Sequence, residues 1–146
     1  MLNKTLLYIF ILYTLSFSTV FSETDSKTEP LELQKIMKAM GNDMQNILMA
    51  INKEDWPAIK QSAVNIAEHP KPPFTEKIRI LSFIGTDTAQ FKKLDTITHN
   101  TAMELVKLAE QENGNAIIDK FAQLQKSCLN CHQSFRKPFQ AHFYGK

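Results

Sequence analysis

The chain has 146 residues, of which 43% are hydrophobic and 22% are charged, and its formal net charge is +2. This length suits one domain with a sizeable hydrophobic core. The charge is nearly balanced, and no basic stripe with aromatic residues in it is present, so nucleic acid is not expected as a partner.

The N-terminal segment has the pattern of a secretory signal peptide. A short start with Lys4 precedes the apolar run "TLLYIFILYTLSFSTVF", and the acidic Glu23 follows. Val20 and Ser22 suit the small-residue positions of a cleavage site, so we expect residues 1–22 to be removed. The alternative is an uncleaved anchor, because the run is just long enough to span a bilayer. No other segment is apolar enough to cross a membrane, so the cleaved protein is not expected to be membrane-embedded.

A regular apolar pattern predicts the first helix. Residues 23–29 are polar and are expected to form a loose segment, which assigns the domain to residues 30–146. Apolar residues then alternate spacings of four and three, as a helix seam in a bundle requires: Leu33, Met37, Met40, Met44, Ile47 and Ile51. Gly41 costs this helix about 1 kcal/mol and would let a bulky group approach the backbone.

The next segments show where helices start and stop. Asp55 suits the N-cap of a second helix with Pro57 in its first turn, and Trp56 is expected to be its buried anchor. The prolines within residues 70–73 end this helix. Residues 75–85, "TEKIRILSFIG", are expected to form a short helical piece.

Two more helices complete the predicted fold. The third is expected from Thr86 or Asp87 to Glu112, with Gly114 as its C-terminal cap. Pro138 is expected to close the fourth. The apolar seam of the fourth helix includes both cysteines of the chain: Ile117, Phe121, Leu124, Cys128, Cys131 and Phe135. Because no strand pattern is found, the sequence predicts an all-α, antiparallel four-helix bundle.

Both cysteines and a histidine lie on the predicted inner face of the last helix. At about 100° per residue, Cys128, Cys131 and His132 point roughly the same way. Two thiols can then join the vinyl groups on one edge of a porphyrin, and the next imidazole can reach the iron. Cys-x-x-Cys-His is specific for c-type haem, and export supports this because such attachment occurs outside the cytoplasm. The sequence predicts one haem c, with Cys128 and Cys131 attached covalently and His132 as the proximal iron ligand.

Other uses of the cysteine pair fit the pattern less well. A zinc site needs four ligands, and the remaining histidines show no paired spacing: His69, His99 and His142. We expect His69 and His99 to be exposed instead. A thioredoxin-like redox pair belongs at the start of a helix that follows a strand. A disulfide between residues this close would constrain little of the unfolded chain.

The sequence resembles the cytochrome c-prime family of bacterial periplasmic cytochromes. "SCLNCHQSFRK" on the last of four helices, "LQKIMKAMGNDMQNI" on the first and "DWPAIKQSAVNIAEHP" on the second carry the resemblance, which covers residues 30–140. The C-terminal position of the haem motif narrows the resemblance to this family among the c-type cytochromes, since most other small ones carry their motif near the N-terminus. The resemblance implies a periplasmic location, redox partner proteins and a candidate homodimer through the first two helices.

The second face of the iron distinguishes two branches of this family. Methionine is a good axial ligand, and His/Met ligation makes an electron-transfer centre. Seam spacing leaves Met37, Met40 and Met44 open, but the family's distal position falls on Met37, with Met40 as the fallback. This predicts a low-spin carrier of single electrons that is not an enzyme. The alternative is a five-coordinate protein that binds nitric oxide or another diatomic gas, for which position 37 would hold Leu or Phe.

Residues around the haem depart from the family at one position. Family members often have an arginine four residues before the distal position that reaches a haem propionate, whereas this chain has Leu33. Arg136 is the better candidate for that charge; alternatively it is an exposed residue in the last helical turn, favourable to the helix dipole. Phe135 and Phe139 are expected to line or close the pocket.

Overall fold

The computed structural model describes residues 31–145, so the predicted signal peptide and loose segment lie outside the described residues. Four long helices form the bundle: α2 (Leu33–Ile51), α3 (Trp56–Ala67), α5 (Thr88–Glu110) and α6 (Gly114–Tyr144). Between α3 and α5 lie the expected short helix, α4 (Phe74–Ile84), and the 3-10 turn η1 (Gly85–Asp87). No strand occurs in the described part, and the predicted all-α four-helix bundle is confirmed.

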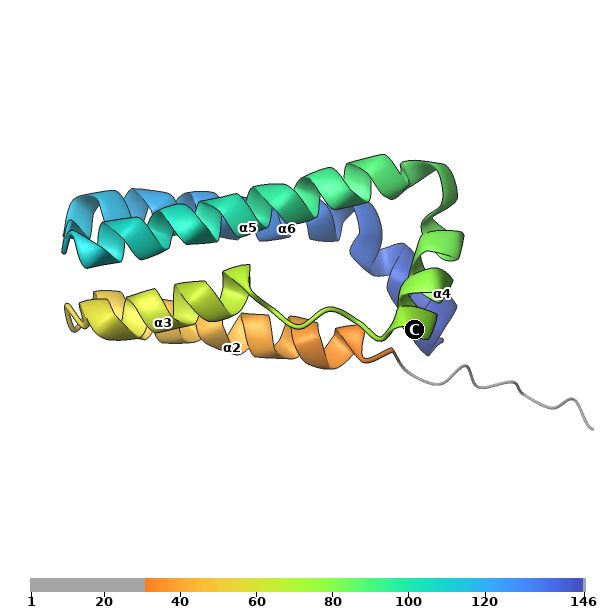
Figure 1. Cartoon of the computed structure of the whole chain (residues 1–146), viewed down its shortest axis with the longest axis horizontal. Coiled ribbons are helices and arrows are strands. Elements are labelled where there is room, and N and C mark those ends of the chain that lie inside the picture. Colours follow the sequence, from red (N-terminus) through yellow and green to blue (C-terminus); the bar gives the residue numbers. More distant parts are fainter. Residues whose placement is uncertain (1–30, 146) are drawn as a thin grey trace, which may run out of the picture.

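The bundle has two layers, as Figure 1 shows: α2 with α3, and α5 with α6, while α4 crosses one end. Helix α3 packs on both α2 and α5, and α5 packs on α6, but α2 and α6 touch at few points. Within residues 31–145, no helix combines the length and hydropathy needed to span a membrane.

The helix ends confirm one sequence signal and correct another. The Asp55 side chain accepts a hydrogen bond from the Ala58 N–H at 3.1 Å, so it caps α3 as predicted. Gly114 is not the C-cap of α5. It is the first residue of α6, and Trp56, which is half-buried, packs 3.4 Å from the position that a Cβ there would take. Helix α5 ends earlier, at Glu110, and Glu112 adopts the left-handed φ of 55° in the turn.

Pro138 does not close the last helix, because α6 continues through it to Tyr144. Proline lacks an N–H and its ring crowds the carbonyl one turn earlier, so it bends a helix whose later turns are held in place. Those turns are held by Phe139 and Phe143, which are buried against α4. In Figure 1 the end of α6 accordingly turns away from α5 towards α4.

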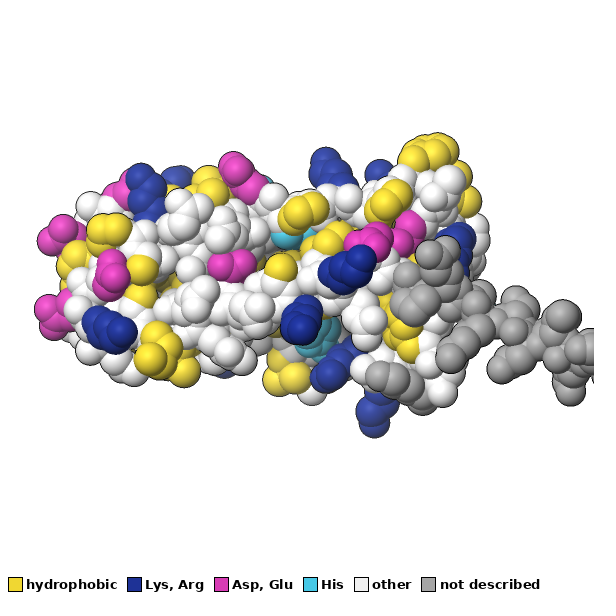
Figure 2. All heavy atoms as spheres, turned by 90° about the horizontal axis from the view of Figure 1, so that it is seen from below, with side chains coloured by type: hydrophobic (Ala, Val, Ile, Leu, Met, Phe, Trp, Pro, Cys, Tyr) yellow, Lys and Arg dark blue, Asp and Glu magenta, His cyan; other side chains and the backbone are white. Residues whose placement is uncertain are grey.

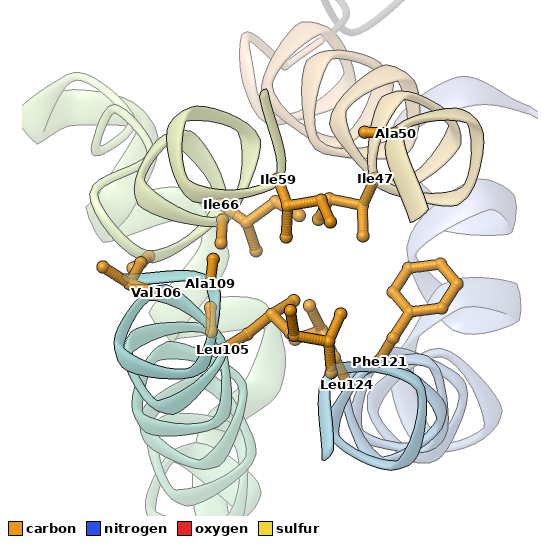
Figure 3. Packing of buried hydrophobic residues seen from close by; sticks show 13 residues of the cluster. Ile47, Ala50, Ile59, Ile66, Leu105, Val106, Ala109, Phe121 and Leu124 are labelled. Atoms are coloured by element: carbon orange, nitrogen blue, oxygen red, sulfur yellow. The ribbon is translucent and has the colours of Figure 1, made fainter. Parts of the chain in front are cut away.

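A first hydrophobic cluster fills the end of the bundle opposite α4. Figure 3 shows Ile47, Ile59 and Ile66 of α2 and α3 facing Leu105 and Leu124 of α5 and α6. All five are almost completely buried. Burial of side chains of this size stabilises a fold by about 1.5–3 kcal/mol each, so this cluster is the main core.

A second cluster lies under α4. Ile80 and Ile84 of α4 pack with Leu31, Phe139 and Phe143. Around them is a group of aromatic contacts in which the Phe83 ring lies 5.4 Å from Phe139 and 5.3 Å from Phe143, both nearly edge-on. The bend at Pro138 is what brings these rings together.

Between the two clusters, the hydrophobic core is interrupted at one level of the bundle. Neither cluster includes any of residues 125–134 of α6, residues 92–101 of α5 or residues 34–39 of α2. Ile36 is buried at this level, yet it belongs to neither cluster. The interruption is therefore shared by three helices, and the cysteine motif lies in it.

Candidate functional site

The three residues of the predicted attachment motif lie together on α6, within the interrupted part of the core. Cys128 and Cys131 are half-buried free thiols, and solvent reaches His132. Within residues 31–145, no three His, Cys, Asp or Glu side chains are grouped so that they could hold a metal ion.

A buried hydrogen bond fixes how α6 is rotated at this level. The Thr98 hydroxyl of α5 donates to the Ser127 hydroxyl at 3.1 Å, and Ser127 donates to the Leu124 carbonyl at 2.8 Å. Both hydroxyls are buried, so this flank of α6 faces α5. His132 follows Ser127 by five residues, about 140° around the helix. His132 therefore lies on the other flank, next to α2.

Helix α2 is oriented in a matching way. The Asn65 amide of α3 donates to the Asp43 carboxylate at 3.1 Å, so that flank of α2 faces α3. Met37 precedes Asp43 by six residues, about 120° around the helix, on the opposite side of the buried Ile36. By helix geometry, Met37 and His132 thus lie on the flanks of α2 and α6 that do not face α3 and α5, and these two helices make few contacts with each other.

The predicted seam of α2 is wrong at Met37. Ile36 takes the core position, and the Met37 side chain is 38% exposed. Met40 and Met44 are half-buried and pack against the first cluster, as the seam predicts. Met37 stays the predicted distal ligand.

His69 is not the exposed loop residue that the sequence predicts. Its side chain is only 19% exposed, and its Nδ1 lies 3.0 Å from the Ile66 carbonyl, just past the end of α3. Its Nε2 lies 3.8 Å from the Asp95 carboxylate of α5. Together with Met40 and Asp43, His69 lines a cavity of about 280 Å³ between α2 and the end of α3.

His99 is exposed as predicted, but it is also tied to a neighbouring helix. Its Nδ1 lies 2.9 Å from the Ala67 carbonyl, the last residue of α3. His69 and His99 therefore both contact carbonyl groups at the C-terminal end of α3. Neither contact has a spacing signal in the sequence, because the partners are backbone atoms.

The environment shifts the pKa values of the motif. Burial, with smaller effects of the Asp95 carboxylate and of Cys128, raises the pKa of Cys131 to about 11. Burial also raises the pKa of Cys128, and a hydrogen bond with Ser127 lowers this pKa by a smaller amount. Partial desolvation of the accessible His132 ring, and then the charge of Arg136, lower the pKa of His132. At neutral pH this favours neutral imidazole, the form that binds metal ions.

The other predicted pocket residues lie next to the motif. Arg136 is exposed and close enough to His132 to affect its pKa. The Phe135 ring is half-buried, 5.2 Å from the Phe91 ring and perpendicular to it, and Phe139 is buried in the second cluster. Leu33 packs its side chain against the second cluster rather than presenting a charge.

One residue that the sequence did not single out is Glu76 of α4. It is only 7% exposed, and its carboxylate accepts hydrogen bonds from the N–H groups of Glu32 at 2.7 Å and Leu33 at 2.8 Å. Helix α2 has no side-chain cap of its own. Glu76 supplies that cap from another helix, one turn before Met37. The sequence signal for such a residue is that the start of α2 has no side-chain cap of its own, so a partner from another element is needed.

The residues present fit a covalently attached haem c. The thiols of Cys128 and Cys131 and the imidazole of His132 lie within about 100° of one another around α6, and they are the donor set that this group needs. Their level of the bundle is left free by both hydrophobic clusters. Apolar residues bound this level at both ends, which suits a large apolar ring.

Comparison with known proteins supports the same conclusion. The family model described as cytochrome C′ matches residues 31–136, a span that includes α2 to α5, most of α6 and the cysteine motif. Comparison with curated proteins and with solved structures gave no match. The matched family implies a covalently attached c-type haem with iron. The chain belongs to the cytochrome c′ family.

Proposed function

We propose that this protein is an exported, periplasmic carrier of single electrons, with one haem c, and that it catalyses no reaction itself. Membership of a family whose proteins are typically periplasmic supports the location. The electron-carrier choice is supported by helix geometry, which puts His132 and Met37 on the flanks of α6 and α2 that do not face α5 and α3. Imidazole and thioether together are the ligand pair of electron-transfer haems.

Each residue of the site has a defined part in this proposal. Cys128 and Cys131 hold the cofactor to α6, and His132, kept neutral by its lowered pKa, is the proximal ligand. Met37 is the distal ligand, with Met40 as the fallback. When bound, haem c supplies the Fe(III)/Fe(II) couple, whose potential a methionine ligand raises. The clusters on either side keep the two ends of the site apolar.

A second candidate is a gas-binding haem protein with an open distal face. The exposed Met37 favours it, because this side chain is 38% exposed and belongs to neither hydrophobic cluster. A methionine that packing does not hold can leave the iron and admit a diatomic gas.

Absorption spectra of the oxidised and reduced holoprotein test the choice. We expect a low-spin wild type with the weak long-wavelength band of methionine bound to Fe(III). Met37→Ala should become high-spin and bind carbon monoxide when reduced. Met40→Ala, on the same helix, is the matched control and should remain low-spin.

Three results would contradict parts of the proposal. A high-spin wild type that binds carbon monoxide would favour the gas-binding candidate. An unchanged spectrum of Met37→Ala together with a high-spin Met40→Ala would move the ligand to Met40. Absence of the Soret band in purified protein would exclude haem altogether.

A further inference from the structure

Charge is divided unequally between the two ends of the bundle. We define the basic half as residues 31–43, 68–95 and 126–145, which include the cysteine motif and α4. It carries ten Lys and Arg against six Asp and Glu, a net charge of +4. The remaining described residues, 44–67 and 96–125, carry four against six, a net charge of −2. On the face drawn in Figure 2, Lys and Arg accordingly gather over the right-hand half.

The positive charges of the basic half are largely unneutralised within the described part. Among its Lys and Arg side chains, only Lys35 forms an ion pair, with Glu32 at 2.7 Å. Two carboxylates of this half have other partners: Glu76 accepts from the backbone of α2, and Asp95 faces His69. In the other half, by contrast, Lys60 and Lys120 are both paired with glutamates.

Three basic side chains flank the motif along the sequence of α6, on the exposed side of the helix. Lys126, Arg136 and Lys137 are exposed and lie on either side of His132 along the helix. Leu129, between them and less than one turn before His132, is 54% exposed. An apolar centre with a charged rim is how protein interfaces are built. The two propionates of haem c would offset only half of the net charge of this end.

We propose that this surface of α6, with Leu129 at its centre and Lys126, Arg136 and Lys137 at its rim, docks a redox protein through an acidic patch. The inference rests on the proposed function, since an electron carrier must bring its iron close to the partner's centre. Complementary charge raises the association rate of two such proteins by about tenfold to a thousandfold, and salt weakens this effect. A protein fits better than an anionic membrane, because α6 offers one exposed leucine rather than a broad apolar face.

The test uses holoprotein on gold electrodes coated with carboxylate-terminated or hydroxyl-terminated monolayers, as models of an acidic and a neutral surface. We compare Lys126→Glu/Lys137→Glu with Lys53→Glu/Lys107→Glu, a matched pair of exposed lysines in the other half. Both variants change the net charge equally. On the carboxylate surface we expect the first to lose about tenfold of its adsorbed voltammetric signal and the second to stay within about twofold of wild type.

Each outcome has one meaning. The proposed docking surface is contradicted if both variants lose the same share of the adsorbed voltammetric signal. It is also contradicted if the wild-type signal is equal on the carboxylate and hydroxyl surfaces. A third result would also contradict it: the protein binds vesicles of phosphatidylglycerol and phosphatidylcholine at physiological salt but shows no preference for the carboxylate over the hydroxyl surface. The partner would then be a membrane. A mediated redox titration of the holoprotein in solution tests the proposed function by itself. If it shows no reversible Fe(III)/Fe(II) couple, the electron-carrier proposal is contradicted, whatever the electrodes show.

Discussion

At the level of single residues, the two thiols are held in their protonated form. The pKa of Cys131 is raised to about 11, chiefly by burial, and that of Cys128 is raised for the same main reason. The thiolate is the reactive form of cysteine. In the closed bundle, the two residues that we propose to form bonds to haem are therefore poorly reactive.

We expect the folded, haem-free chain to react slowly with iodoacetamide at about pH 8. With a pKa of about 11, roughly one Cys131 thiol in a thousand is ionised there. The rate should rise about tenfold per pH unit towards the pKa, provided that the fold persists. Mass spectrometry of the labelled peptide measures this, and urea-unfolded chain is the control. Equal rates in folded and unfolded chain would refute it.

The neighbouring residues Ile36 and Met37 show where sequence reasoning fails at this scale. Spacing of four and three assigns Met37 to the seam, but Ile36 is the buried residue. The rotation of α2 is set by partners distant in sequence, Glu76 at its start and Asn65 along its side. Local periodicity carries no information on such contacts. The cysteines and His132, whose spacing is itself the signal, lie together on α6.

At the level of elements, the start of α2 depends on α4. The buried Glu76 carboxylate binds two N–H groups at the point where the positive end of the helix dipole favours a negative charge. Because α2 lacks a side-chain cap of its own, α4 fixes where it starts. This contact links a short connecting helix to the predicted position of the distal ligand.

We expect Glu76→Ala to lower the free energy of unfolding by about 2 kcal/mol, because hydrogen bonds to charged groups are worth about 1.5–3 kcal/mol. Urea denaturation followed by circular dichroism measures this. Glu32→Gln is the control: it removes an exposed ion pair with Lys35, which contributes little to stability because solvent screens it. Equal effects of the two substitutions would contradict the capping role.

The elements themselves were largely predictable, and the errors have physical causes. Helix periodicity, the Asp55 cap and the prolines after α3 give the helices in the right order. Pro138 was taken as a stop because a proline destabilises a helix locally. The stabilisation that carries α6 past it comes from Phe139 and Phe143 on α4, a tertiary contact with no local pattern.

At the level of the whole molecule, the core is divided in two, and its halves differ in size. The first cluster joins four helices, whereas the second depends on α4 and the bent end of α6. Opening of a region costs less free energy where fewer buried apolar contacts are lost. The molecule should therefore open first at the α4 end.

Hydrogen exchange tests this order of opening. We expect amides of α4, residues 74–84, to exchange with a lower opening free energy than those of α3, residues 56–67, because all the main packing of α3 lies in the larger cluster. Peptide-resolved mass spectrometry measures both segments in one experiment. Equal protection of the two helices would mean that the bundle opens as a single unit.

The position of the cysteines on α6 sets an order of events during biogenesis. Helix α6 follows the other helices in the chain and is synthesised after them, yet its Ile117, Phe121 and Leu124 complete the larger cluster. Until α6 arrives, the earlier helices lack part of their core, and the thiols lie on chain that is not yet buried. Attachment of haem to the thiols thus competes in time with the packing of α6 into the bundle. A chain that closes first keeps Cys131 as an unreactive thiol, so slow closure favours maturation.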